Sequence, residues 1–181
     1  SLSPLLTKVN REDFADFLES NMKAQVKNKM DKMSEMKVLT KDYLFLQTTS
    51  QSSFQMKLLQ LNDTTKIICV IYTVCGPVSD SRILFYTSDW KELSLKDYID
   101  MPGMESFFLT PNPAKIEEYN NARIPLDFYL LKADLSKDNN DIAFTFTSPE
   151  YLDESSAKVL EPFLKIFLTY VWKEGRFSLK N

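Results

Sequence analysis

The sequence contains no histidine and only three glycines. Without histidine, the chain lacks the commonest general base, the commonest zinc ligand and the side chain that titrates near neutral pH. The glycines, Gly76, Gly103 and Gly175, lie far apart in the chain. A loop that cradles phosphate needs clustered glycines, because its backbone amides must approach the anion closely. These absences argue against such nucleotide-binding folds and against histidine-dependent catalysis.

Cysteine is equally scarce. Cys69 and Cys75 lie in a single apolar run. If that run is a strand, the two residues are about 20 Å apart at about 3.3 Å per residue, whereas a disulfide needs Cα atoms within about 7 Å. We therefore expect both thiols to be free and buried on one face. Thiolate formation is disfavoured in such surroundings, so neither cysteine is a good candidate nucleophile.

Long apolar runs and charge of one sign are also missing. The longest apolar run, Ile67 to Cys75, is too short to span a bilayer, which takes about 20 residues. The chain opens with Ser-Leu-Ser-Pro, so we expect a processed or trimmed start from which a leader has been removed. The 22 basic and 25 acidic residues are well mixed and give a net charge of −3. This balance supports neither a nucleic-acid stripe nor a polybasic membrane patch.

Apolar residues, by contrast, are plentiful. They make up 44% of the 181 residues and aromatics 13%, which is enough to bury a core. We expect a single α+β domain over residues 1–181, with halves 1–99 and 126–181 joined by a proline-rich connection, 100–125.

The stretch from Phe54 to Trp90 contains three apolar, β-branched and aromatic runs separated by polar turn residues. This pattern predicts a largely antiparallel meander sheet. Before it, 43–48 reads as a strand. The run 66–75 is apolar on both faces and predicts the central strand, and 83–88 predicts the strand that closes the meander.

Residues 9–30 have the pattern of an amphipathic helix packed on this sheet. Asn10 is a good N-cap, and large apolar residues follow at helical spacing, namely Phe14, Phe17, Leu18, Met22, Val26 and Met30. Met30, Met33 and Met36 form a Met-x-x-Met-x-x-Met run. It suggests either a thioether site for Cu(I) or, as we favour, gap-filling where the helix leaves the core.

The connection 100–125 carries four prolines, which disfavours long strands. Asn112 and Pro113 predict the start of a short helix that runs through Tyr119. Large apolar residues in this region are candidate binding residues, namely Met104, Phe107, Phe108 and Tyr119. They could form an aromatic lip over a ligand or partner groove, or plug the core from a long connection, which is the commoner role of such residues.

The second half predicts strands at 128–135, 142–147, 166–172 and 176–179. A short helix starting at Asp153 or Ser155 should end or kink at Pro162. Trp-Lys-Glu occurs at 90–92 and again at 172–174, each time after an apolar run. The two halves could therefore be decayed repeats of one meander, or the triplets could coincide by chance.

Side chains for catalysis are hard to group from the sequence. The acidic cluster 138–141 lacks the glycine and distal glutamate of a calcium loop, and it reads better as a polar hairpin turn. Carboxylates could serve a hydrolase, but nothing pairs the candidates, which are Asp89, Glu92, Glu117 and Glu118. Solvated faces explain them more simply. We expect no metal and no cofactor.

Several motifs carry a resemblance over most of the chain: REDFADFLESNMKAQV, LTKDYL, SSFQMKLL, FYTSDW, FTSPEYL and YVWKEGRF. With these motifs the chain resembles a family of exported domains of unknown function from Bacteroidales-type Gram-negative anaerobes. The resemblance implies an exported mature protein, periplasmic or outer-membrane-associated, and it implies no catalytic residue.

From these patterns we expect a non-catalytic exported binding protein or an envelope-associated protein. Its partner would be an unknown protein or an apolar ligand of the cell envelope, with no nucleic acid involved. The alternatives are a carboxylate-dependent hydrolase and a carrier that holds an apolar ligand inside a curved sheet.

Overall fold

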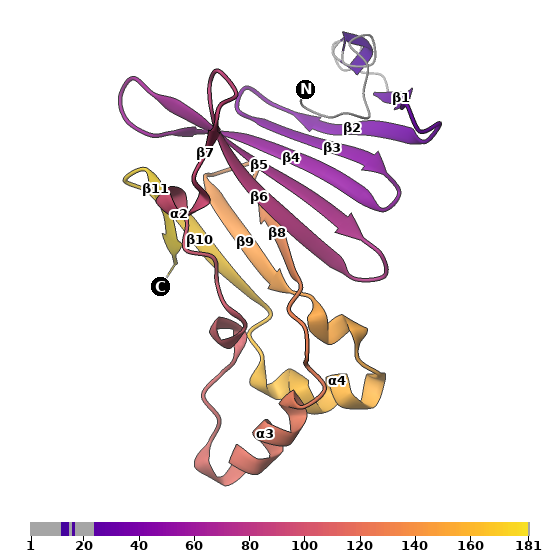
Figure 1. The fold of residues 1–181 in the computed structure, drawn as a ribbon, viewed down its shortest axis with the longest axis vertical. Coiled ribbons are helices and arrows are strands. Elements are labelled where there is room, and N and C mark those ends of the chain that lie inside the picture. Colours follow the sequence, from indigo (N-terminus) through magenta and orange to yellow (C-terminus); the bar gives the residue numbers. More distant parts are fainter. Residues whose placement is uncertain (1–11, 15, 17–23, 181) are drawn as a thin grey trace.

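The computed structural model describes residues 12–14, 16 and 24–180. Within these residues, seven strands form a meander sheet in which every strand pairs antiparallel with its neighbours in sequence (Figure 1). They are β1 (Gln25–Lys27), β2 (Met33–Leu39), β3 (Tyr43–Thr49), β4 (Ser52–Gln60), β5 (Lys66–Cys75), β6 (Ser79–Thr87) and β7 (Glu92–Leu93). The predicted α+β class with a largely antiparallel meander is confirmed.

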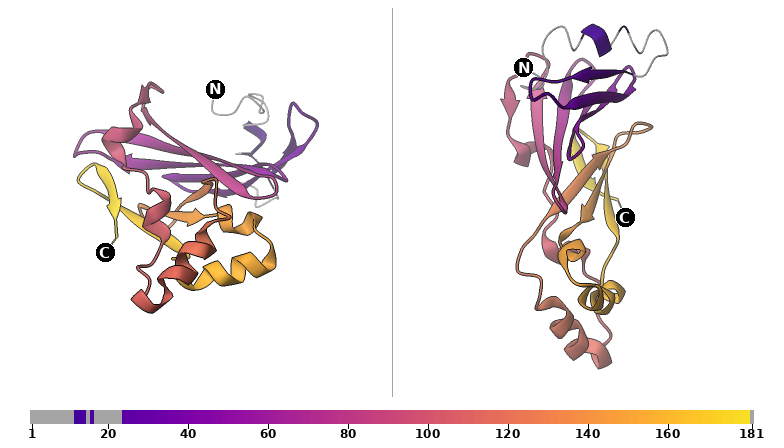
Figure 2. Two further views of the ribbon diagram at one scale, coloured as in Figure 1. Left: turned by 60° about the horizontal axis from the view of Figure 1, so that its bottom comes forward. Right: turned by 90° about the vertical axis from the view of Figure 1, so that its right-hand side faces the viewer.

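A second antiparallel sheet, in the order β11-β10-β9-β8, packs on one face of the meander sheet (Figure 2). Its strands are β8 (Leu131–Leu135), β9 (Asp141–Phe146), β10 (Phe167–Lys173) and β11 (Arg176–Leu179). The sequence predicted a strand at 128–135, but β8 begins three residues later, at Leu131. Instead of pairing, Tyr129 donates its hydroxyl to the carbonyl of Pro102 at 2.6 Å.

The helices lie mainly at one end of the molecule, below both sheets in Figure 1. They are α2 (Leu95–Tyr98), α3 (Ile116–Arg123), α4 (Glu154–Leu160) and the 3-10 helices Met104–Phe107, Pro113–Lys115, Ser148–Tyr151 and Glu161–Phe163. We call residues 100–125 and 148–166 the helical lobe. α2 lies outside this lobe, beside the sheets (Figure 1).

The helix N-caps predicted from the sequence are present in the lobe. The Asn112 side chain accepts the amide hydrogen of Ala114 at 3.0 Å, as an N-cap does. The helix continues through Arg123, one turn beyond the predicted end. Asp153 caps α4 in the same way, and α4 ends at Leu160, two residues before Pro162.

The predicted helix over 9–30 is wrong at its C-terminal end. Residues 12–14 and 16 are helical, and Phe14 is buried against the face of the meander sheet that points away from the second sheet. Gln25–Lys27, however, is a strand paired with β2. The Asn28 side chain donates through Nδ2 to the carbonyl of Thr48 at 2.9 Å and fixes the chain there. Residues 9–11, 15 and 17–23 of the predicted helix lie outside the described ranges.

The methionine run correspondingly spans a turn and a strand. Met30 and Met33 are exposed, so their predicted gap-filling role is wrong, and only Met36 packs on apolar neighbours. Met33 and Met36 lie an odd number of residues apart on β2, so their side chains point to opposite faces. That arrangement does not favour a shared thioether site.

The core lies between the two sheets. Fully buried aromatic and aliphatic side chains from both sheets fill it, including Phe85, Phe144, Phe177, Leu59, Ile71 and Ile142. Cys69 belongs to this core, and burial raises the pKa of its thiol. Both cysteines are free, as predicted, but Cys75 is exposed because it ends β5.

A row of polar contacts, which we call the polar seam, joins the two sheets. β8 is the edge strand of the second sheet, and it crosses β4, β5 and β6. The amides of Leu131, Ala133 and Leu135 donate to Asp80 Oδ1 (3.1 Å), Ser81 Oγ (3.0 Å) and Gln55 Oε1 (2.8 Å), in that order. Buried amides need hydrogen-bond partners. These side chains supply the acceptors that a neighbouring strand would otherwise provide along this edge of β8.

Candidate binding surface on the helical lobe

Several large apolar side chains are exposed on the helical lobe. Ile166 is 82% exposed and Ile124 is 75% exposed, the two highest values among the large hydrophobic residues that the structure describes. Other exposed hydrophobic residues of the lobe are Met101, Leu109, Ile116, Tyr151 and Val159. Single exposed residues of this kind are ordinary, whereas exposed residues that line surface hollows, as Ile124, Val159 and Ile166 do, are typical of an interaction surface.

The four predicted binding residues lie in this lobe, but mostly beneath its surface. Phe107, Phe108 and Tyr119 are buried in the core between lobe and sheets, and Met104 is half-buried. Phe108 packs edge-on against Tyr119, with ring centroids 5.8 Å apart. Phe107 packs on Phe146 of β9. Three of the four therefore plug the core, and their part in binding stays a prediction.

The structure brings Met104, Phe108 and Tyr119 together around Arg123, a residue that the sequence analysis missed. The Arg123 guanidinium lies 4.2 Å from the ring centre of Phe108 and 5.1 Å from that of Tyr119. Its Nη1 donates to the Tyr119 hydroxyl at 2.6 Å, and its Nη2 pairs with the Glu105 carboxylate. The spacing of Tyr119 and Arg123, four residues apart on one helix, was the available signal.

Two opposing effects act on the charge of Arg123. Partial burial works to lower the pKa of the guanidinium. The bond to Glu105, together with the nearby Tyr119, outweighs burial and raises the pKa. Arg123 is therefore a fixed positive charge, held in place by aromatic rings on one side and a carboxylate on the other.

A hollow of about 300 Å³ opens beside Arg123. Its other lining residues are Met104, Asn120, Ile124 and Leu126. Three of these four are apolar, and one carries an amide. The hollow thus combines aliphatic walls with one cationic group.

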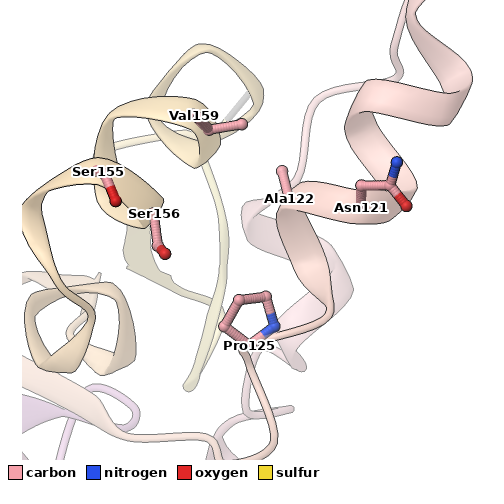
Figure 3. A pocket seen from close by; sticks show the side chains of 6 residues that line it. All are labelled: Asn121, Ala122, Pro125, Ser155, Ser156 and Val159. Carbon is pink, nitrogen blue, oxygen red and sulfur yellow. The ribbon is translucent and has the colours of Figure 1, made fainter.

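A second hollow, of about 240 Å³, lies between α3 and α4. Figure 3 shows Ser155, Ser156 and Val159 on α4 facing Ala122 and Pro125 across it. The hydroxyl groups of both serines donate to Asp153. Hydrogen bonds from Ser155 and Ser156 hold the pKa of Asp153 below its ordinary value. The serines are therefore part of a helix cap.

A third hollow, of about 390 Å³, lies on the side of α4 that faces the start of β10. Phe146, Pro149, Leu164 and Ile166 give it apolar walls. Glu150, Glu154, Glu161, Lys158 and Lys165 contribute charges of both signs. The lobe thus carries hollows on several sides.

A smaller hollow, of about 180 Å³, lies away from the lobe where the two sheets meet. Its lining is largely polar and includes Gln51, Ser53, Lys132 and Asp134. Lys132 and Asp134 pair with each other at 2.7 Å, so neither charge is free.

The carboxylates considered for a hydrolase are not brought together. Glu117 and Glu118 lie on α3, whereas Asp89 and Glu92 lie at the hairpin between β6 and β7, at the other end of the molecule (Figure 1). Within the described residues, no three histidine, cysteine, aspartate or glutamate side chains are grouped as a metal site would need.

The acidic cluster 138–141 forms a hairpin turn, as the sequence indicates. Ser136 accepts the amide hydrogens of Asp138 and Asn139, each at 3.2 Å. Asn139 accepts that of Asp141 at 2.9 Å. These side chains organise the turn between β8 and β9.

The fold and these surfaces define a two-sheet α+β domain that carries an apolar helical lobe. The chain belongs to the family described as "Protein of unknown function (DUF3256)", whose profile matches residues 1–177. No curated protein matches it. A similar solved structure is a domain of an uncharacterized protein from Porphyromonas gingivalis W83, at 27% identity and a TM-score of 0.83. The match covers 98% of this chain and 90% of that one.

These matches confirm the predicted family resemblance. They name no activity, ligand or partner. In the part of the chain that the structure describes, no helix has the length and apolarity needed to cross a membrane.

Proposed function

We propose that this protein is a non-catalytic binding protein of the cell envelope and that it engages its partner through the helical lobe. The observation that carries the proposal is the gathering of exposed apolar side chains and open hollows on that lobe. Short helices and connections held by a rigid scaffold are where binding concentrates. Here the two packed sheets are the scaffold.

The proposed location is outside the cytoplasm, in the periplasm or at the outer membrane. Support comes from the resemblance to exported domains. Fractionation of the source cells, followed by detection of the chain with a specific antibody, tests it. Recovery with periplasmic or outer-membrane marker proteins is expected, and recovery with cytoplasmic markers would contradict it.

The placement of the candidate carboxylates favours binding over a carboxylate-dependent hydrolase. A hydrolase of this kind needs two carboxyl groups that flank the bond it cleaves. Glu117 and Glu118 lie on α3, whereas Asp89 and Glu92 lie at the hairpin between β6 and β7, at the other end of the molecule (Figure 1).

The packing between the sheets favours surface binding over a carrier with an internal cavity. Phe85, Phe144 and Phe177 are fully buried there. The Phe85 and Phe177 rings lie 6.3 Å apart, centroid to centroid, so they occupy the space that an internal ligand would need. The apolar hollows that could take a ligand open on the lobe.

A retention experiment tests the proposed surface. The immobilised chain is exposed to envelope extract, alongside the variants Ile166→Glu and Val159→Glu and a control, Val74→Glu, which alters an exposed valine on β5. The two lobe variants should lose species that the unmodified chain and the control both retain, because a charge in an apolar interface is costly. Equal retention by all four proteins would overturn the proposal.

A further inference from the structure

We propose that Arg123 anchors the carboxylate of an aliphatic ligand whose hydrocarbon chain lies in the hollow lined by Met104, Ile124 and Leu126. The inference rests on the proposed function, since it names the chemistry that one part of the helical lobe binds. The ligand class is an aliphatic monocarboxylate.

The first support is the fixed geometry of Arg123. Phe108 and Tyr119 present ring faces to the guanidinium, and the Tyr119 hydroxyl holds Nη1 at 2.6 Å. A guanidinium has five N–H donors, in a planar fork that matches a carboxylate. The bonds to Tyr119 and Glu105 use two of them. A pre-organised cation loses little freedom when an anion binds.

The second support is the nature of the present partner. The Glu105 side chain is 73% exposed, whereas the Arg123 side chain is 26% exposed. Exposed ion pairs contribute little to stability, so a second carboxylate can replace Glu105 without disturbing the fold. Glu105 thus acts as an internal competitor for the ligand's carboxylate.

The third support is the wall of the hollow. Met104, Ile124 and Leu126 are apolar, and Ile124 is 75% exposed. An aliphatic chain lying here would remove that surface from water, which is favourable in proportion to the apolar area covered. Asn120 is the polar exception in the lining. A cation beside an aliphatic trough fits an amphiphilic anion better than a sugar or a nucleotide.

Binding of octanoate to the full chain, measured by titration calorimetry, tests the proposal. Octanol and octylamine supply the same chain without the carboxylate, and acetate supplies the carboxylate without the chain. We expect octanoate to bind at least tenfold more tightly than any of these three probes. Equal binding of octanol and octanoate would overturn the proposal, because Arg123 would then have no role.

Three variants locate the site. Glu105→Gln removes the internal competitor and should tighten octanoate binding at least threefold. Arg123→Met should weaken it at least tenfold. Arg82→Met, at an exposed arginine on the meander sheet, is the control for lost surface charge and should leave binding unchanged. Unchanged or weaker binding by Glu105→Gln would overturn the proposal.

Glu105→Gln keeps the test valid if Arg123→Met fails to fold, since it leaves the aromatic packing of Arg123 in place. Failure here is distinguishable from failure of the proposed function. If octanoate does not bind but Ile166→Glu and Val159→Glu lose species in the retention experiment, only the proposal of a carboxylate site at Arg123 is refuted. If both fail, the helical lobe has no binding role.

Discussion

The two ends of the molecule use apolar side chains in opposite ways. Between the sheets, Phe144 and Phe177 are covered almost completely, and they pack among other buried rings. On the helical lobe, Ile124 and Ile166 are among the most exposed hydrophobic residues described. Both regions belong to one chain with one composition, so the difference lies in how the fold places the residues.

Polar groups follow the same division. In the polar seam, the Gln55 amide is buried, and both its oxygen and its nitrogen are bonded. Lys57 is buried and reaches Asp42 at 3.1 Å and the carbonyl of Lys137 at 3.3 Å. On the lobe, the partner carboxylate Glu105 is largely exposed. The polar groups named here are thus buried and bonded at the sheets, whereas the Glu105 carboxylate on the lobe stays open to solvent.

The largest expected effect tests this division directly. Phe144→Ala should lower the free energy of unfolding by about 3–5 kcal/mol, because it leaves a cavity in the core. Ile166→Ala, on the exposed lobe, should change it by no more than about 0.5 kcal/mol. Urea unfolding of both variants, followed by tryptophan fluorescence, measures the difference.

Similar losses in the free energy of unfolding for Phe144→Ala and Ile166→Ala would contradict the proposed difference between the core and the helical lobe. A large loss for Ile166→Ala would mean that this side chain is covered in solution, by a second copy or by another part of the chain. Running the unfolding at several protein concentrations separates these cases, since only association makes the midpoint depend on concentration.

A smaller effect is expected at the polar seam. Gln55→Leu leaves the Leu135 amide without its acceptor, and a buried unsatisfied amide costs about 1–3 kcal/mol. Gln60→Leu is the control, because Gln60 is exposed at the end of the same strand. It should change stability by no more than about 0.5 kcal/mol. Faster hydrogen exchange at Leu135 in Gln55→Leu alone would place the loss at the seam.

The sequence predicted the sheets better than it predicted the lobe. Alternation and apolar runs locate β3, β5, β9 and β11 to within a residue or two, because burial on a pleated face leaves a periodic pattern. The apolar pattern misled us at β1. The position of Val26 fits the spacing of an amphipathic helix, and it fits equally the strand that pairs with β2. A spacing of four residues is compatible with either element.

The sequence drew attention to the segment 100–125 but not to Arg123. Phe108 and Tyr119, which it named as candidate binding residues, pack against the Arg123 guanidinium, and their part in binding stays a prediction. Arg123, Glu105 and the hollow come together only through the fold of the connection. Glu105 and Arg123 are separated by most of that connection, and no local pattern predicts their pairing. Ile166 reaches the same lobe from the second half of the chain.

The smallest expected effect is the pH dependence of stability that Asp153, the N-cap of α4, contributes to the lobe. Hydrogen bonds lower the pKa of Asp153 in the folded state. Its stabilising contribution is therefore present above the unfolded pKa of about 3.9, and it is lost as the pH falls through the lower folded pKa. Asp153→Asn should keep the cap at neutral pH, since asparagine also caps helices well, but it should remove this acid dependence.

Thermal unfolding between pH 2 and 6 measures the effect, with Asp153→Ala as the variant that has no cap at any pH. The acid-dependent part of the difference between the native chain and Asp153→Asn should be small, because the site is fully exposed on a helix of seven residues. If Asp153→Asn were as unstable as Asp153→Ala at pH 7, the negative charge would matter more than the hydrogen bonds. The cap of α4 would then depend on the charge of Asp153 more than on its hydrogen bonds.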